Sequence, residues 1–413
     1  MSASLLPEDF AAADSCRELL ADFPQFREVP GLPQARMLVE YIIGRRRGEL
    51  DVSGRDAAGT FIDAAALAEV PHRIIVIDDA RGIQTALLGR LAEVVVHHDR
   101  IDESRAAAHV ADAGELSTLA ELSTGDGATA GETWAIINAP KTTSALAETV
   151  AGLQPYVSAI IVIGRSAAMS RAVNKELARG FGRVDVSPGV GKHRMIIATR
   201  PLSAPSLSVF PKHGTIAHPG VGELEVRAYG ACFSGVRSDE GSTLLLDAVI
   251  EASPAAESVF DLGCGNGWLL TAVTRVTGAP RAVGVDVSKA AVASARATVE
   301  ANGIDADIVT GDAADPDDPG VAQLGSFDLI VLNPPFHQGT AIETDTASAM
   351  MTAAAGHLAP DGVVITVFNT HLRYRDRLEA IIGHSEQLAR NKKFTVVASR
   401  GRSATSSPGP RRR

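Results

Sequence analysis

One stretch of the sequence combines groups that could hold an aromatic amine for chemistry at its nitrogen. Four apolar residues, 329–332, are followed at once by Asn333, Pro334, Pro335 and Phe336. The two prolines fix their own backbone angles and restrict the residue before them, so the chain leaves the apolar run stiffly. The Asn333 side-chain oxygen and the Pro334 carbonyl could then accept hydrogen bonds from one NH2 group while the Phe336 ring stacks on its plane. The alternative is a proline-rich turn that caps a strand, with Phe336 packed inward.

A glycine-rich loop upstream could hold a cofactor beside this stretch. It contains Asp261, Gly263, Gly265, Asn266 and Gly267, between an apolar run and a helical pattern. Glycine lets a backbone turn sharply and approach a ligand closely. The G-x-G-x-G spacing differs from the G-x-G-x-x-G pattern of dinucleotide-binding folds, which argues against a nicotinamide-dependent dehydrogenase. The loop instead resembles the first motif of class I S-adenosylmethionine-dependent methyltransferases, where it lies against the methionine part and the ribose.

Two acidic residues extend this cofactor prediction. Asp286 ends the next predicted strand, where a carboxylate can bind both ribose hydroxyls. Asp312 follows the third strand, where it can accept a hydrogen bond from the adenine amine. Each acid alone would be interpreted as a helix N-cap or a surface residue. Together with the glycine loop, they predict an S-adenosylmethionine site.

The elements that position these residues form two similar halves. In the second half, apolar runs predict strands at residues 258–261, 282–286, 307–312, 327–332, 363–368 and 393–398. In the first half, they predict strands at residues 72–78, 94–96, 134–137 and 159–163, and an edge hairpin of 182–186 with 194–198. Ligands of open α/β sheets bind beyond the carboxyl ends of the strands, which is where Asn333, Asp286 and Asp312 fall.

The first half looks like a decayed copy of the second. Residues 78–84 align with 261–267, with the acid kept and the first and third glycines replaced; residues 138–141 align with 333–336, with the Asn kept. The prediction is an α/β fold of two tandem Rossmann-like class I methyltransferase domains, the N-terminal one degenerate. Convergence of two ordinary α/β domains is the alternative. We expect a degenerate domain over residues 1–205, a linker at 206–220, a catalytic domain over 221–400 and a disordered basic tail at 401–413.

Composition restricts the class of protein. The 413 residues include three cysteines, far apart and without CxxC spacing, so we expect neither a disulfide framework nor a metal site. No secretory signal and no apolar run long enough to span a bilayer is seen, which predicts a cytoplasmic protein without membrane contact. The net charge of -10 argues against a globally nucleic-acid-attracting surface. Basic clusters near Arg373 and at residues 392–393 are interpreted first as solvated faces, with more weight on Arg373 because it follows the predicted site.

The second half resembles the ribosomal RNA guanine-N2 methyltransferases of the small subunit methyltransferase C and large subunit methyltransferase G type. The matching stretches are residues 233–234, 239–246, 261–267, 333–339, 357–358, 369–374 and 391–394. The resemblance implies S-adenosylmethionine as cofactor, the exocyclic N2 amine of a guanine as acceptor, and ribosomal RNA or a ribosomal subunit as partner. It also implies a degenerate N-terminal domain that helps with RNA binding and stability.

The site residues take different roles in this prediction. The catalytic residues are predicted to be Asn333, Pro334 and Phe336, and the substrate-binding residues to be Pro335, His337, Arg373 and Tyr374. Hydrogen bonds accepted from both N–H bonds favour a pyramidal nitrogen and aim its lone pair at the methyl group, so no strong base is needed before transfer. A base inside a helix must first be flipped out at a cost of a few kcal/mol, and stacking on Phe336 could return about 1–3 kcal/mol.

Other functions stay open on the sequence. Methylation of a release-factor glutamine or of adenine N6 is the alternative among enzymes, although those enzymes more often carry Tyr or Trp in place of Phe336. A non-catalytic RNA-binding or assembly factor is the alternative outside enzymes, and the intact glycine loop argues against it. The target nucleotide and the assembly state of the substrate are not determined, nor is the oligomeric state, for which a monomer is the expectation.

Overall fold

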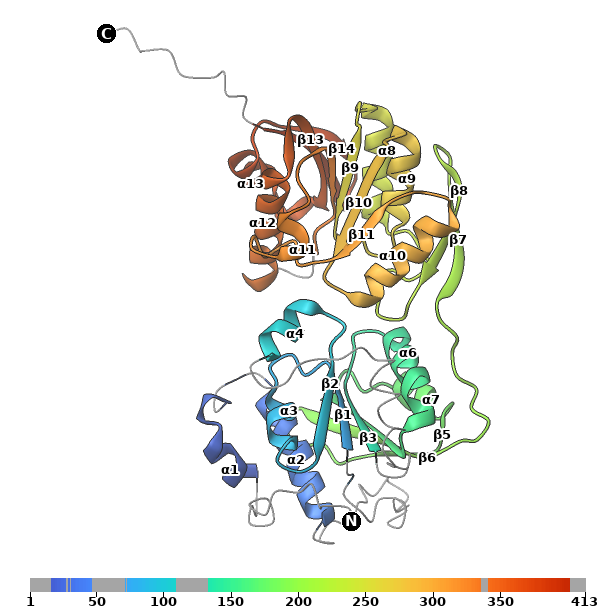
Figure 1. Cartoon of the computed structure of the whole chain (residues 1–413), viewed down its shortest axis with the longest axis vertical. Coiled ribbons are helices and arrows are strands. Elements are labelled where there is room, and N and C mark those ends of the chain that lie inside the picture. Colours follow the sequence, from blue (N-terminus) through green and yellow to red (C-terminus); the bar gives the residue numbers. More distant parts are fainter. Residues whose placement is uncertain are drawn as a thin grey trace, which may run out of the picture. The chain divides into compact units, whose positions relative to one another are not determined.

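The computed structural model describes residues 16–26, 29, 31–46, 71, 73–108, 133–335 and 341–401. The chain separates into two compact units, Met1–Phe210 and Pro211–Arg413, and each is described by itself. In each unit, a mostly parallel sheet carries helices on both faces (Figure 1). Within the described ranges, no helix has the length and apolarity that a bilayer crossing needs. The predicted tail lies outside the described residues from residue 402 onward.

The first unit is built on a six-stranded sheet in the order β2-β1-β3-β4-β6-β5. Its strands are β1 (Arg73–Ile77), β2 (Glu93–His97), β3 (Thr133–Asn138), β4 (Ala159–Arg165), β5 (Phe181–Val186) and β6 (His193–Pro201). β6 runs antiparallel to both neighbours, which confirms the predicted edge hairpin. Its helices are α1 (Cys16–Leu19), η2 (Leu20–Asp22), η3 (Pro24–Phe26), α2 (Leu32–Arg46), α3 (Ile83–Leu88), α4 (Ile101–Ala107), α6 (Thr143–Leu153), η6 (Gln154–Tyr156) and α7 (Arg171–Leu177). Apolar side chains of α2 and α3 pack on one face of the sheet, and those of α6 and α7 pack on the other.

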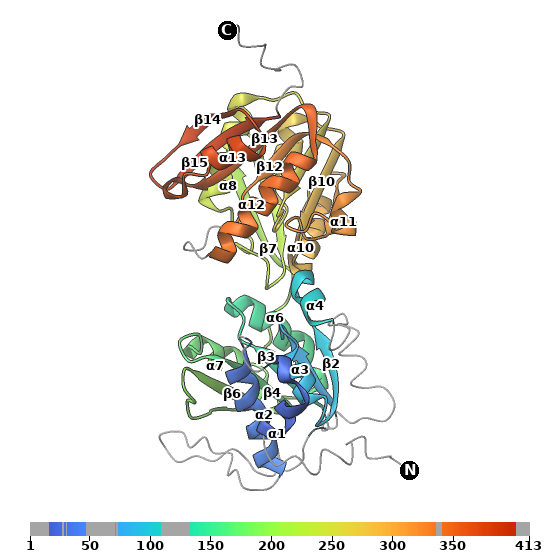
Figure 2. The same cartoon turned by 90° about the vertical axis from the view of Figure 1, so that its left-hand side faces the viewer.

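The second unit is built on a seven-stranded sheet in the order β11-β10-β9-β12-β13-β15-β14. Its strands are β9 (Ser258–Leu262), β10 (Arg281–Asp286), β11 (Asp307–Thr310), β12 (Phe327–Leu332), β13 (Leu358–Asn369), β14 (Ser385–Arg390) and β15 (Phe394–Arg400). Its helices are α8 (Glu240–Ala252), α9 (Trp268–Thr277), α10 (Lys289–Ala301), α11 (Pro319–Ala322), α12 (Ala341–Gly356), η7 (Thr370–Leu372) and α13 (Arg375–Ile381). Figure 2 shows α11, α12 and α13 over one face of the sheet, and α8, α9 and α10 pack on the other.

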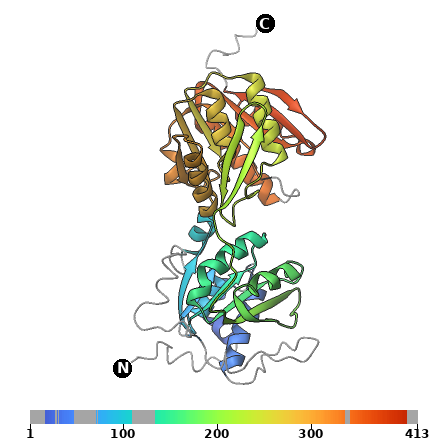
Figure 3. The same ribbon diagram turned by 90° about the vertical axis from the view of Figure 1, so that its right-hand side faces the viewer.

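A two-stranded hairpin precedes the second sheet, formed by β7 (Lys212–His218) and β8 (Gly222–Ala228). β8 lies along α10 (Figure 3). The N–H groups of Arg227 and Tyr229 donate to Thr298 Oγ1 at 3.0 Å and to Ser294 Oγ at 2.9 Å. β7 falls within the residues predicted as a linker, and the sequence prediction contains neither this hairpin nor β14. These strands were missed because none contains a long apolar run: exposed residues interrupt the buried ones in β7 and β8, and only Ser385 of β14 is buried.

The strand beneath the predicted site is buried on both faces. Residues 329–332 of β12 have no exposed surface, because α8 to α10 cover one side of the sheet and α11 to α13 cover the other. Burial of each of these side chains stabilises the fold by roughly 1.5–3 kcal/mol. The end of β12 is therefore a rigid support for Asn333.

The two sheets share one strand order, which confirms the predicted tandem Rossmann-like folds. Strands β2, β1, β3, β4, β6 and β5 of the first unit correspond to β10, β9, β12, β13, β15 and β14 of the second, where β11 is added at one edge. The strand register confirms that Asn138 is the counterpart of Asn333. Ile137 pairs with Ile77 just before Asn138, as Leu332 pairs with Leu262 just before Asn333.

The predicted alignment of the two glycine loops is wrong by two residues. The loop between β1 and α3 is as long as the loop between β9 and α9, so Asp78 corresponds to Gly263 and Gly82 to Gly267. Backbone angles agree: φ is 58° at Asp78 and 83° at Gly263, and 69° at Gly82 and 77° at Gly267. The first unit therefore keeps the third glycine, and its acid is not the equivalent of Asp261. Matching acid to acid in the sequence gave the wrong register because the backbone conformation, not the side chain, is what the two loops share.

Candidate active site

The predicted cofactor loop lies at the carboxyl edge of the second sheet. The N–H groups of Gly263 and Cys264 both donate to the carbonyl of Val285, at 2.9 and 3.0 Å, which ties the loop to the end of β10. The φ angles of Gly263, Gly265 and Gly267 are 83°, 54° and 77°. These left-handed conformations favour glycine, so the local sequence determines the path of the loop.

The loop borders open space at one glycine and is tightly packed at another. A Cβ on Gly267 would lie 2.7 Å from the Cα of Ala295 on α10, so helix packing requires glycine there. A Cβ on Gly265 would meet no atom within 4 Å. The middle of the loop is therefore accessible to a ligand, while its end is fixed against α10.

Asp286 joins the glycine loop to β10 through its side chain. Its Oδ2 accepts from the Gly265 N–H at 3.0 Å, and its Oδ1 accepts from the Ser288 N–H at 2.9 Å. The Gly311 N–H donates to the Asp286 carbonyl at 3.0 Å, which brings the end of β11 alongside. The carboxylate predicted to bind ribose thus lies directly beside the glycine loop.

Asp261 is a buried carboxyl group whose Oδ2 has no hydrogen-bond partner among the described residues. Only 2% of the residue is exposed. Burial, together with the nearby carboxylates of Asp286 and Asp239, raises the pKa of Asp261 to about 8. A hydrogen bond from the Leu270 N–H acts in the opposite direction and lowers this pKa. A ligand that brings positive charge or N–H donors would satisfy this group. S-adenosylmethionine carries both an ammonium and a sulfonium, so the orphaned oxygen and the open space at Gly265 fit that cofactor.

Two predicted cofactor residues use their side chains inside the protein. The Asn266 side chain donates to the carbonyls of Gly235 and Arg237, at 2.7 and 3.3 Å, and its Oδ1 accepts from the Trp268 N–H at 3.2 Å. A cofactor contact of Asn266 would therefore come from its backbone. The Asp312 Oδ1 accepts from the Ala314 N–H at 2.9 Å, so one oxygen supports the turn after β11. The cofactor roles of both residues stay predictions.

The Asn333 amide is fixed by the first turn of α8. Its Nδ2 donates to Asp239 Oδ1 at 3.2 Å and to Ser242 Oγ at 2.8 Å, and Asp239 also caps α8 by accepting from the Ser242 N–H at 2.9 Å. An ionised carboxylate only accepts hydrogen bonds, so the amide nitrogen must face Asp239. The side-chain oxygen of Asn333 then faces the opposite way, as an acceptor.

The sequence prediction lacks Asp239 and Ser242 as site residues. Asp immediately before an apolar helical pattern is typical of a helix N-cap. That signal identifies the cap but not its contact with Asn333.

The other predicted catalytic and substrate-binding residues differ in their surroundings. Pro334 is buried and Pro335 is exposed, whereas Phe336 and His337 lie outside the described residues. Tyr374 is 6% exposed and its ring packs 5.7 Å from the Phe368 ring, so it belongs to the core, and its predicted substrate contact gains no support.

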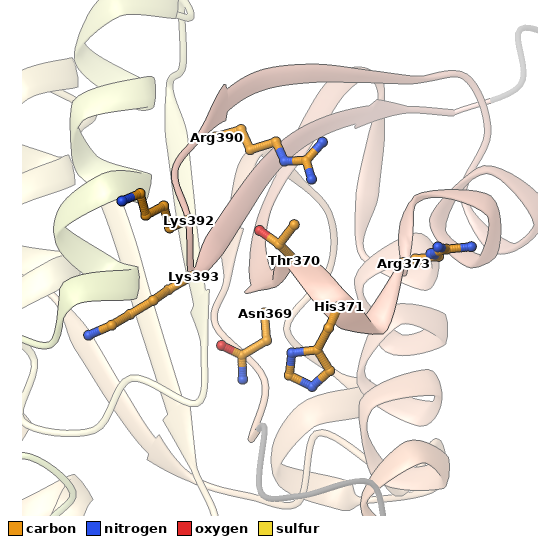
Figure 4. A pocket seen from close by; sticks show the side chains of 7 residues that line it. All are labelled: Asn369, Thr370, His371, Arg373, Arg390, Lys392 and Lys393. Atoms are coloured by element: carbon orange, nitrogen blue, oxygen red, sulfur yellow. The ribbon is translucent and has the colours of Figure 1, made fainter.

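Arg373 is exposed, adopts a φ of 51° and lines an open basic pocket beyond η7 (Figure 4). The substrate roles of Arg373 and Pro335 and the catalytic role of Pro334 stay predictions.

Known methyltransferases are similar to this chain in sequence. A family model described as a methyltransferase small domain matches residues 223–398. Ribosomal RNA large subunit methyltransferase G of Shewanella amazonensis is 30% identical over 349 residues, which are 80% of this chain and 86% of that one. Ribosomal RNA small subunit methyltransferase C of Pseudomonas aeruginosa is 37% identical over 179 residues, 43% of this chain and 52% of that one. The match thus spans about half the length of the latter protein.

A solved structure shares the fold. The 16S rRNA N2 methyltransferase RsmC of T. thermophilus, in complex with AdoMet and guanosine, aligns with a TM-score of 0.68 at 23% identity. The alignment covers 81% of this chain and 89% of that one.

The fold and the loop at its carboxyl edge define a class I methyltransferase. The similarity to large subunit methyltransferase G extends over most of both chains. The chain belongs to the ribosomal RNA guanine-N2 methyltransferase family, of the small subunit methyltransferase C and large subunit methyltransferase G type.

Proposed function

We propose that the second unit transfers a methyl group from S-adenosylmethionine to the exocyclic N2 amine of a guanine in ribosomal RNA. The observation that carries this proposal is the orientation of Asn333. Its NH2 group is held by Asp239 and Ser242, so its oxygen is presented as an acceptor at the edge that also carries the glycine loop. The family's curated members, named as ribosomal RNA methyltransferases, support the substrate class.

The residues that would hold S-adenosylmethionine are those of the loop and the neighbouring strand ends. Gly263 and Gly265 would lie against it, Asp286 would accept from the ribose hydroxyls, and Asp312 would accept from the adenine amine. Asp261 would face its positive charge, which matches a buried carboxyl with an unpartnered oxygen. When bound, the cofactor supplies an activated methyl group on its sulfonium.

The chain's own part in the reaction is to orient the acceptor nitrogen. Asn333 Oδ1 and the Pro334 carbonyl accept from the two N–H bonds of the amine, which aims the nitrogen lone pair at the methyl group. Positioning of this kind replaces a bimolecular encounter by a fixed geometry. No strong base is required before transfer, because the methylated nitrogen becomes an acidic ammonium that then releases its extra proton to solvent. Phe336 would stack on the flipped-out base, returning about 1–3 kcal/mol of the unstacking cost.

The first unit has no catalytic part in this proposal. We assign catalysis to residues 221–400 and a structural or RNA-binding role to the degenerate domain over residues 1–205. The partner is ribosomal RNA or a ribosomal subunit, and a monomer in the cytoplasm suits that substrate.

One experiment tests the proposal directly. Ribosomal RNA of each subunit is isolated from wild-type cells and from cells lacking the gene, digested, and analysed for N2-methylguanosine by mass spectrometry. The expected result is a loss of this nucleoside from one subunit in the deletion strain, restored by the wild-type gene. Unchanged N2-methylguanosine in both subunits contradicts the proposal. Loss of N6-methyladenosine or of methylglutamine in a release factor would instead identify one of the alternatives.

A further inference from the structure

An open basic pocket of about 600 Å³ lies beyond the carboxyl end of β13. Its lining comes from two places: the end of β13 with η7, and the turn between β14 and β15. The lining residues are Asn369, Thr370, His371, Arg373, Arg390, Lys392 and Lys393 (Figure 4). Four of the seven therefore carry permanent positive charge, in a chain whose net charge is -10.

The turn that presents these cations is firmly built. The Asn391 side chain accepts from the N–H groups of Lys393 and Phe394, at 2.8 and 2.7 Å, which closes the turn. The Thr370 N–H donates to the Lys393 carbonyl at 2.8 Å, and the hydroxyls of Thr370 and Thr395 lie 3.0 Å apart. The turn is thus attached to η7, and its charged side chains project from a fixed backbone.

The pocket is connected to Asn333 through the start of α8. Lys393 Nζ bonds Glu240 Oε2 at 2.7 Å, and Glu240 directly follows Asp239, which holds the Asn333 amide. Gly241 comes so close to the Phe394 ring that an added Cβ would lie 3.4 Å from its Cε1. One helix start therefore joins the acceptor site to the basic turn.

Two of the pocket's positive charges are available, and the four are spread out. Arg390 and Lys392 are exposed, and in the described part of the chain neither forms an ion pair. In Figure 4, Lys392 and Lys393 point toward α8, Arg390 lies above Thr370, and Arg373 is directed away from the other six side chains. This arrangement does not enclose a single small anion. It suits a ligand that carries several negative charges along its length.

We propose that the β14–β15 turn pocket binds the phosphodiester backbone of the RNA next to the methylated nucleotide. This inference rests on the proposed function for the identity of the polyanion. A nucleotide whose base is flipped into the site at Asn333 has its backbone on the outside, where Arg390 and Lys392 would neutralise neighbouring phosphates. Such contacts carry no sequence information and fix the position of the strand.

The test is the salt dependence of RNA binding, which requires no methyl transfer. Affinity of the full-length protein for a short fluorescein-labelled single-stranded RNA is measured by anisotropy over a series of KCl concentrations. The plot of log K against log salt has a negative slope, and each lost phosphate contact reduces its magnitude by about 0.7, so Arg390→Gln/Lys392→Gln should reduce that magnitude by about 1.4. Binding of S-adenosylmethionine by the same variant, measured by calorimetry, should stay at the wild-type value and shows that the unit is folded.

The matched control is Lys212→Gln/Arg400→Gln, which removes the same two charges from exposed positions of the same unit. Arg400 ends β15, six residues beyond Phe394, and is therefore about 20 Å from the turn. The control should keep the wild-type slope.

The same salt slope in the pocket variant, the control and the wild type overturns the inference. A pocket variant that keeps the wild-type slope, and in which only the competition of inorganic phosphate with RNA is lost, also overturns it. A failure of the proposed function would instead appear as unchanged N2-methylguanosine in deletion cells.

Discussion

The same asparagine stands at the same position in both units and has different hydrogen-bond partners. In the first unit, Asn138 Oδ1 accepts from Gln84 Nε2 at 2.7 Å, and its Nδ2 donates to Gln84 Oε1 and to the Ile77 carbonyl. Both ends of the amide are used inside the protein. In the second unit, the partners on α8 take only the NH2 end of Asn333. The asparagine alone therefore does not make an acceptor site. The neighbouring residues determine whether its oxygen is left for a ligand.

The cofactor edge shows the same contrast. By strand register, His98 stands where Asp286 stands in the second unit. Ligand atoms of Asp78, His98 and Glu103 lie within 4.8 Å of one another, so polar side chains fill this edge, and the predicted absence of a metal stays a prediction. Burial and the neighbouring Asp78 raise the pKa of Glu103 to about 7. The first unit thus places three titratable side chains at the edge where the second unit places Asp286.

The largest difference between the two units is expected when the asparagine of each unit is replaced by alanine. Asn333→Ala should lower kcat by about 100-fold to 1000-fold, the range for loss of one side-chain amide that stabilises a transition state, with cofactor affinity unchanged. Methylation of ribosomal RNA from deletion cells measures kcat, and calorimetry measures the affinity.

Asn138→Ala is the control in the first unit. It should leave kcat unchanged while destabilising that unit by about 1–3 kcal/mol, because Gln84 loses a buried acceptor. Equal effects of the two variants on kcat would contradict the different roles assigned to the two amides.

Substitution at the cofactor edge should have the next largest effect. In Asp286→Asn, the new side chain can accept from only one of the Gly265 and Ser288 N–H groups, since its NH2 faces the other. Loss of a charged acceptor costs about 1.5–3 kcal/mol, which corresponds to a Kd for S-adenosylmethionine raised about tenfold or more. The counterpart His98→Asn should leave this Kd unchanged; a rise in both would show that the first unit also takes part in cofactor binding.

A smaller effect is expected from two glycine substitutions, which together distinguish the cost of backbone strain from the loss of cofactor binding. Gly265→Ala and Gly278→Ala both place a methyl group in open space at a positive φ, 54° and 66°. Each should lower the free energy of unfolding by about 1–2 kcal/mol. Only Gly265→Ala should also weaken S-adenosylmethionine binding, because its methyl group enters the space that the cofactor is proposed to occupy. Equal affinity of the two variants for S-adenosylmethionine would contradict the placement of the cofactor beside Gly265.

The last expected effect is a pH dependence of stability that arises from Asp261. Its pKa is raised from 3.8 to about 8, so between these values the folded unit holds a proton that the unfolded chain releases. The free energy of unfolding of the unliganded protein should therefore fall as pH rises through this window, by at most about 1.4 kcal/mol per pH unit.

Asp261→Asn should remove that slope. Trp268 lies in the second unit and Trp134 in the first, so urea unfolding followed by fluorescence in a Trp134→Phe background reports on the second unit. A slope that persists in Asp261→Asn would assign it to another group.

Much of this molecule could be predicted before its structure was known. Strands β9, β10 and β12 are mostly apolar and largely buried, as is expected of parallel strands covered on both faces. The hairpin β7–β8 and strand β14 could not be predicted in this way, because none of these strands buries a run of apolar residues. The alignment of the two loops failed for a related reason, since Asp78 and Gly263 share a backbone conformation that their letters do not reveal.

The sequence by itself determined which groups are present: a glycine loop, acids after successive strands, and an asparagine held stiffly before two prolines. The tertiary structure decided which of their atoms are left for a ligand. Asp239 is 94 residues from Asn333 and Gln84 is 54 residues from Asn138, so chain folding alone brings each pair together. An amide has two different ends, and only its neighbours in space determine which end faces the substrate.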